Sequence, residues 1–196
     1  MTETEIRGQM DGAKPAPEPL NNSNNKERRQ GYRLIDVPPL EALIDAVERA
    51  FRDVERGKYK LKDLALVSVL VFTGCKIGEA LRLSREDIEL ENRAIRFKKR
   101  GEFTRIVPVP SRLFWDVIEW YIRKYTGDKV FEISERQVRN IVYKFSLRYL
   151  KKKIRPHAIR HAYAIAVFRK TKDLEELRRL LGHSDYKHLK HYLEYS

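Results

Sequence analysis

A histidine and an arginine lie three residues apart in the segment RPHAIRHAYA (residues 155–164), and a second histidine follows directly. In a helix, this spacing places His157 and Arg160 on one face, about one turn apart. Both side chains can direct positive charge toward the same point, so the pair could cap a helix, hold a buried carboxylate or bind a phosphate. His161 must point to another side of the helix than Arg160, which predicts packing or a backbone hydrogen bond for it.

The overall charge favours the phosphate. The chain has 196 residues, a length typical of one domain, and a formal net charge of +13. Residues 1–30 contain five acidic and five basic residues, so the whole excess belongs to the rest of the chain. An excess of that size attracts polyanions, and nucleic acid is the expected partner. No basic amphipathic helix with a bulky apolar face points to a membrane surface.

Several classes of protein are excluded by composition. The single cysteine, Cys75, rules out an internal disulfide and a zinc site built on thiolates. The longest apolar run, residues 64–73, is too short to span a bilayer. Acidic residues near the N-terminus stand where a secretory signal needs a basic start and an apolar core. We therefore expect an intracellular, cytoplasmic protein.

The elements that must position the histidine and the arginine are mostly helices. PAPEP and NNSNN, with almost no apolar periodicity around them, predict a flexible leader over residues 1–31 and one domain over 32–196. Apolar spacing predicts helices over about 40–55, 61–73 and 113–125. A capping box of Ser134 and Gln137 predicts another that runs to about residue 150. Capping residues predict a helix opened by Pro156, another capped by Asp173 and Glu176, and ends at Gly74 and Gly182.

A hairpin completes the fold. RAIRFK and TRIVPV alternate in the manner of strands around KRGEF, which predicts two antiparallel strands. Ser84 with Asp87 indicates another helix start or a tight turn. The predicted class is therefore mainly α with a small antiparallel β-sheet (α+β).

Four segments together resemble the catalytic domain of tyrosine recombinases, closest to the integrase and Xer-type branch. TGCKIGEALRLSREDIEL, RAIRFKKRGEFTRIVPVP, PHAIRHAYA and LGHSDYKHLKHY occur in the family's order, and the likeness covers about residues 33–196. It implies the catalytic-domain fold of DNA breaking-rejoining enzymes and a reaction that needs no metal, ATP or other cofactor. A tyrosine hydroxyl attacks a DNA phosphodiester, which forms a 3′-phosphotyrosyl link and frees a 5′-hydroxyl.

The resemblance assigns roles to residues of this chain. His157 and Arg160 match the family's HxxR pair, and His183 in LGHSD matches a position held by histidine or tryptophan. Tyr192, nine residues after His183, matches the nucleophile. Nine residues of unbroken helix would turn about 900°, so His183 should lie on a turn and Tyr192 on the next helix. The rival hydroxyls of Tyr186 and Tyr195 lack this spacing.

The hairpin should carry a lysine that protonates the departing 5′-oxygen. Lys98, Lys99 and Arg100 compete for this position. The commonest loop length, counted back from Pro108, points to Arg100, but an arginine does not readily release a proton. We therefore predict Lys99 as the acid. The predicted DNA contacts are Lys98, Arg100, Lys187 and Lys190.

One residue departs from the family pattern. Lys76 stands where the family has its first catalytic arginine. It keeps the positive charge, at a helix start that also favours an anion, but loses the planar fork that holds two phosphate oxygens. Loss of an oriented donor can cost on the order of 10²–10³ in rate. Glu79 matches the acid that braces the active site.

The leading hypothesis is a site-specific DNA recombinase or integrase of an archaeal virus or other mobile element. It would act on double-stranded DNA as a dimer to tetramer, at the nucleoid or in the host cell. An alternative is a weakened or inactive DNA-binding relative that modulates a full-length recombinase. Another is a type IB topoisomerase-like nicking-closing enzyme. Residues 1–31 cannot replace the family's helical DNA-clamping domain, and four residues after Tyr192 cannot be swapped between subunits. We therefore expect a minimal or truncated catalytic domain, or one that assembles differently.

Overall fold

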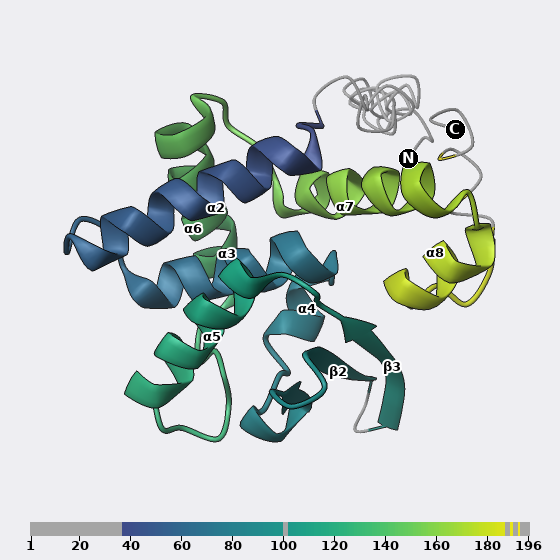
Figure 1. Ribbon diagram of the computed structural model, residues 1–196, viewed down its shortest axis with the longest axis horizontal. Coiled ribbons are helices and arrows are strands. Elements are labelled where there is room, and N and C mark those ends of the chain that lie inside the picture. The colour runs from purple at the N-terminus through teal and green to yellow at the C-terminus, as the bar shows by residue number, and fades with distance from the viewer. Residues whose placement is uncertain (1–36, 100–101, 187–188, 190–191, 193–196) are drawn as a thin grey trace, which may run out of the picture. The chain divides into compact units, whose positions relative to one another are not determined.

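The computed structural model (Figure 1) describes residues 37–99, 102–186, 189 and 192, with the side chains of 99 and 102–104 outside the description. The predicted leader and the first residues of the predicted domain therefore lie outside it. The described helices are α2 (Leu40–Glu55), α3 (Leu61–Thr73), α4 (Ile77–Ala80), α5 (Arg112–Lys124), α6 (Glu135–Leu150), α7 (Pro156–Thr171) and α8 (Leu174–Leu181). The strands are β1 (Ile88–Glu89), β2 (Ala94–Lys99) and β3 (Glu102–Pro108). The prediction of a mainly helical domain with a small antiparallel sheet is confirmed.

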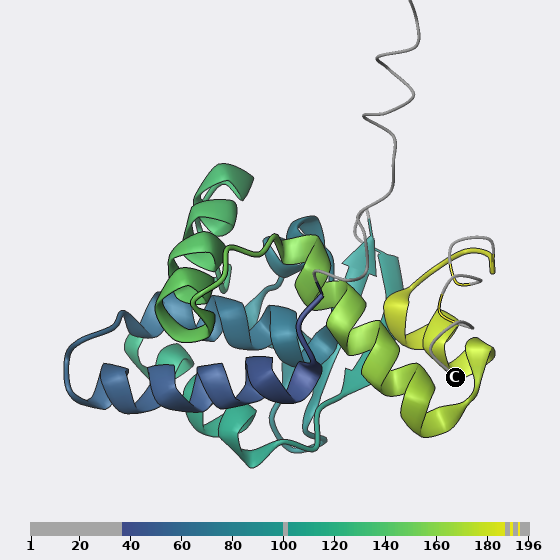
Figure 2. The same cartoon turned by 90° about the horizontal axis from the view of Figure 1, so that it is seen from above.

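Helix α3 forms the centre of the core. Its sequence LKDLALVSVLVFT is apolar on nearly all sides, so it needs neighbours around its whole circumference. It contacts α2, α5, α6 and α7, and Figures 1 and 2 show α2 lying alongside it. Helix α2 is amphipathic instead and buries one stripe, formed by Leu43, Ala46, Val47, Ala50 and Val54. None of the described helices is long and apolar enough to cross a membrane.

Two glycines end helices where other chain segments come close. Gly74 caps α3 in the left-handed region (φ 59°), and a Cβ there would lie 2.4 Å from Cδ1 of Tyr163. Gly182 ends α8 with φ 65°, and a Cβ there would lie 2.5 Å from Nη1 of Arg105. Both positions require the missing side chain and the positive φ. The ends of α3 and α8 can therefore approach α7 and β3 closely.

The predicted caps and the hairpin are also confirmed. Ser134 accepts from the backbone N–H of Gln137, and Asp173 accepts from two N–H groups in the first turn of α8. Strands β2 and β3 pair from Ala94 opposite Pro108, with a register shift after Phe97. The Ser84 signal corresponds to one turn of 3₁₀ helix, η2 (Arg85–Asp87). Strand β3 contacts α8, and Arg105 of this strand lies against the end of α8 at Gly182.

Candidate active site

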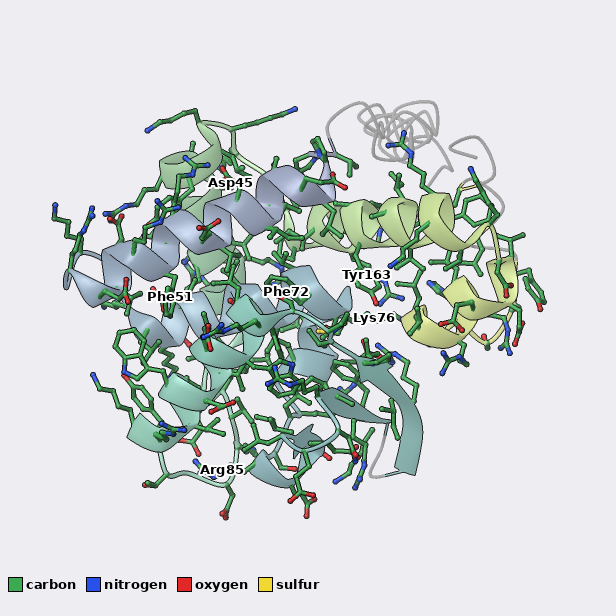
Figure 3. All side chains as sticks on the ribbon, viewed as in Figure 1. Asp45, Phe51, Phe72, Lys76, Arg85 and Tyr163 are labelled. Atoms are coloured by element: carbon green, nitrogen blue, oxygen red, sulfur yellow. The ribbon has the colours of Figure 1, made fainter. Side chains whose placement is uncertain are left out.

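A pocket of about 420 Å³ lies where α4, α6 and α7 begin, and we call it the helix-end pocket. Lys76 is the N-cap of α4, and His157 and Arg160 lie in the first turns of α7. Pro156 occupies the first position of α7, where its fixed φ suits a helix start. The pocket is lined by Lys76, Glu79, His157 and Arg160 among others, so four predicted site residues are brought together. Figure 3 labels Lys76 at the start of α4.

Arg160 is held between the ends of two helices. Its guanidinium is 5% exposed and donates from Nη1 to the carbonyl of Gly74 and from Nη2 to that of Leu181, both at 2.8 Å. Carbonyls at helix C-termini carry partial negative charge, which compensates the buried cation. Burial lowers the pKa of Arg160, and the Glu79 carboxylate opposes that shift. A guanidinium has five N–H donors, so donors remain for a ligand in the pocket.

His183 completes the contacts of Arg160. It lies on the turn after α8, as predicted, and its Nε2 is 3.0 Å from Nη2 of Arg160. A guanidinium can only donate, so Nε2 must accept. This requires a neutral His183 with its proton on Nδ1. The imidazole of His183 and the guanidinium of Arg160 are therefore in direct contact.

Glu79 braces this arrangement through a residue that sequence reasoning missed. Arg105 of β3 donates to both oxygens of Glu79, at 2.7 and 3.0 Å, and also to the carbonyl of Leu180. Glu79 in turn accepts from the backbone N–H of Lys76 at 2.7 Å. Burial alone would raise the pKa of Glu79, but the hydrogen bonds and charge of Arg105 bring it below its usual value. One signal was available in the sequence. Arg105 lies two residues before the apolar Val107 in a strand, so both side chains are on the same face, which is the buried one.

Tyr192 is not among the residues that line the helix-end pocket. Its ring is 3% exposed and packs in a group that we call the tyrosine cluster. The buried members of this cluster are Tyr163, Ala164, Ile165, Phe168, Leu177, Leu181, Leu189 and Tyr192. The predicted helix around Tyr192 falls largely on residues outside the description. The backbone N–H groups of Leu189 and Tyr192 donate three residues back, which is the spacing of a 3₁₀ turn.

His161 is buried and packs, as predicted, and it also makes a side-chain contact that was not predicted. Its Nδ1 lies 2.6 Å from the hydroxyl of Tyr192. Its ring also meets that of His157 edge to face, with centroids 4.4 Å apart. The spacing of four between His157 and His161 places the two side chains on one helix face, and this signal is present in the sequence. With Nδ1 as acceptor, the phenol donates to an imidazole, the geometry that a general base requires.

Of the two hairpin lysines, the structure describes the side chain of Lys98 but not that of Lys99. Nζ of Lys98 pairs with Glu86 at 2.6 Å and with the buried Asp87 at 2.8 Å, and these carboxylates raise its pKa. Lys98 is thus engaged within the protein. The backbone of Lys99 ends β2, but its side chain is outside the description. Three further predicted contacts also lie outside the described residues: Arg100, Lys187 and Lys190.

The chemistry of the pocket is that of an anion site. Lys76, His157 and Arg160 face one space, and the Glu79 carboxylate beside them is already paired with Arg105. Burial raises the pKa of the adjacent Cys75 thiol to about 12, so no thiolate nucleophile is available there. Among the described residues, no group of three or more His, Cys, Asp or Glu side chains could hold a metal ion. A phosphate fits the remaining donors.

Comparison with known proteins gives the class of this domain. The model of the Phage integrase family matches residues 37–196, and the chain belongs to this family. Its fold is shared with the crystal structure of XerA recombinase, with a TM-score of 0.62 and 24% identity over 76% of this chain and 57% of that one. It is also shared with XerH bound to a palindromic difH substrate in a post-cleavage complex. That match has a TM-score of 0.66 and 22% identity over 80% of this chain and 48% of that one.

The chain is also similar to curated proteins that are named tyrosine recombinases. Tyrosine recombinase XerA of Saccharolobus solfataricus is 30% identical over 173 residues, which are 83% of this chain and 52% of the relative. Tyrosine recombinase XerH of Campylobacter jejuni is 28% identical over 157 residues, 74% of this chain and 43% of the relative. The chain thus spans about half the length of the curated relatives that it matches. The resemblance inferred from the four segments is confirmed at the level of the family and the fold.

Proposed function

We propose that this domain cuts and rejoins DNA strands in site-specific recombination or integration, with Tyr192 as the nucleophile. The observation that carries the proposal is the convergence of Lys76, His157 and Arg160 on one pocket. A contact from Arg160 to His183, and one from His161 to the Tyr192 hydroxyl, support the roles proposed for the other candidate groups. A net charge of +13 on the chain suits a DNA partner. Two of the structural neighbours are XerH complexes with a DNA substrate, before and after cleavage.

The proposed reaction balances as one displacement at phosphorus. The Tyr192 oxygen forms a bond to the phosphorus, the bond from phosphorus to the 5′-oxygen breaks, and the phenol proton passes to His161. The 5′-oxygen leaves as a hydroxyl after it receives a proton from Lys99. Arg160, His157 and Lys76 neutralise the charge that develops on the non-bridging oxygens. A 5′-hydroxyl of a partner strand reverses the step.

The phenol must move for this reaction. Tyr192 is buried in the tyrosine cluster and does not line the helix-end pocket. Attack therefore requires the phenol to leave this packing and reach the phosphate. The proposal includes assembly as a dimer to tetramer on DNA. In such an assembly, each Tyr192 attacks the phosphate in its own subunit or in a neighbouring one.

A covalent capture experiment tests the proposal. The full chain is incubated with a pool of random-sequence duplexes that carry a nick, so that a cleaved strand diffuses away and the protein–DNA link is trapped. Wild-type protein should yield a complex that survives denaturation, and Tyr192→Phe should yield none. Tyr186→Phe is the matched control, since Tyr186 is 46% exposed and bonds to Glu175 instead. If Tyr192→Phe still traps DNA, the assigned nucleophile is wrong.

A non-catalytic DNA-binding relative is the second candidate, favoured by Lys76 and by the burial of Tyr192. Such a protein would bind duplex DNA with a log–log salt slope of about −0.9 per neutralised phosphate and would trap no DNA. The topoisomerase-like alternative differs from a recombinase in its products. A topoisomerase-like enzyme would relax a supercoiled plasmid without joining two DNA sites.

A further inference from the structure

We infer that Arg82 is a phosphate-binding residue of the helix-end pocket and supplies the guanidinium that Lys76 does not provide. The inference rests on the proposed function, since it concerns how the reacting phosphate is held. It adds a residue that neither the sequence patterns nor the resemblance assigned to the site.

The position of Arg82 follows from the short helix α4. Lys76 caps the start of this helix, Leu81 its end, and Arg82 comes next. Both Lys76 and Arg82 line the helix-end pocket. Nη1 of Arg82 lies 3.3 Å from the place that a Cβ on Gly78 would occupy. The absence of a side chain at Gly78, four residues earlier on the same face, lets the guanidinium lie close to the α4 backbone.

The guanidinium of Arg82 is not committed elsewhere. Its side chain is exposed and makes no hydrogen bond or ion pair with any residue that the structure describes. Neighbouring arginines differ. Arg85 donates to two backbone carbonyls, and Arg105 holds Glu79. Arg82 and Arg85 are thus both exposed, but Arg85 is used in a structural contact and Arg82 is available for a ligand.

The carboxylates near Arg82 do not neutralise it. Glu79 accepts from Arg105 on both of its oxygens, and Glu135 pairs with Arg139 at 2.5 Å. A dianionic, five-coordinate phosphate offers several oxygens and gains most from a planar donor that reaches two of them. Lys76 acts as a point charge at one side of this space. Arg82, also on the pocket wall, can add the fork.

The first test uses inorganic phosphate and does not require cleavage. The ¹⁵N-labelled full chain is titrated with phosphate, and the arginine Nε–H signals are followed by NMR. The Arg82 signal of the wild type should shift, and Arg82→Ala should weaken phosphate binding about tenfold or more, as expected for a lost charge-assisted hydrogen bond. Arg56→Ala is the matched control: it removes the same charge from an exposed arginine outside the pocket.

A double-variant cycle tests the specific link to Lys76. In Lys76→Arg protein the planar donor is restored, so adding Arg82→Ala should weaken phosphate binding less than it does in the wild type. With a duplex selected by covalent capture, Arg82→Ala should slow single-turnover cleavage at saturating DNA about 10²-fold, again less in the Lys76→Arg background.

Two results would overturn the inference. One is a phosphate titration in which Arg82→Ala behaves like Arg56→Ala. The other is a normal single-turnover rate for Arg82→Ala at saturating DNA, because the guanidinium would then serve a phosphate other than the reacting one. If wild-type protein traps no DNA at all, the proposed function fails, and the phosphate titration still decides whether Arg82 belongs to the pocket.

Discussion

The helix-end pocket and the tyrosine cluster hold their functional groups in different ways. In the pocket, Arg160 and Glu79 are fixed by directional contacts: helix-end carbonyls for the cation, and Arg105 for the carboxylate. In the tyrosine cluster, the ring of Tyr192 lies among aliphatic and aromatic side chains, and its hydroxyl contacts His161. Directional charged contacts fix an orientation, whereas apolar packing restricts position without a preferred direction.

This difference separates the task of binding from the task of attack. Cations that meet a developing negative charge act best when their geometry is set before the reaction. In the proposed reaction the phenol has to leave its packed position once per cycle. Contacts with apolar side chains have no preferred direction, so that change costs less than breaking a buried ion pair. We therefore expect substitutions in the two regions to differ in size and in the way that they can be rescued.

Arg105→Met should have the largest effect on stability. It leaves the Glu79 carboxylate buried without its partner, and loss of one member of a buried ion pair costs about 3–5 kcal/mol. Urea unfolding at pH 7 measures the change. Adding Glu79→Gln should recover part of it, because the buried carboxylate is then gone and Arg160 loses only a partner at 4.0 Å. Arg52→Met, which breaks an exposed pair with Glu48, is the control and should cost under about 1 kcal/mol. Equal losses for Arg105→Met and Arg52→Met would show that the pocket is not held by charge.

His161→Phe should have a smaller effect, on the tyrosine cluster. The buried hydroxyl of Tyr192 loses a hydrogen-bond partner, at a cost of about 1–3 kcal/mol in the free energy of unfolding. The double variant with Tyr192→Phe should be close to wild type in stability, since both polar groups are then gone. Unfolding by urea of the single and double variants gives the coupling between the two side chains. An additive double variant would mean that the contact contributes nothing.

The acid dependence of stability should carry the smallest contribution, from Glu79. Its folded-state pKa is below the usual value of 4.5, so its ion pair stabilises the protein fully above that value. The contribution is lost as the pH falls below about 4.5 and through the folded-state pKa. The stability difference between wild type and Glu79→Gln should therefore be largest at neutral pH and shrink toward pH 3. A difference that grows on acidification would reverse the assigned sign.

Much of the fold could be predicted because its signals are local. The cap of α6 at Ser134, the ends of α3 and α8 at Gly74 and Gly182, and the pairing of β2 with β3 depend on residues within one or two turns of each other. The spacing of His157 and Arg160 likewise fixed their common face before any tertiary contact was known. The family pattern added the order of the four segments and the family itself.

The contacts that decide the chemistry join residues that are distant in the sequence, and only the tertiary structure specified them. Arg160 meets Gly74 across 86 positions, Arg105 meets Glu79 across 26, and His161 meets Tyr192 across 31. Periodicity places a side chain on a face, but it cannot say which group covers that face, because this depends on how whole helices pack. The sequence by itself indicated Lys76, His157 and Arg160 as candidates for phosphate binding, because their spacing and the family pattern are local signals. The packing of α7 against α3 and α8 decided that two helix ends preorganise Arg160, and the folded pocket added Arg82, which no local pattern had marked.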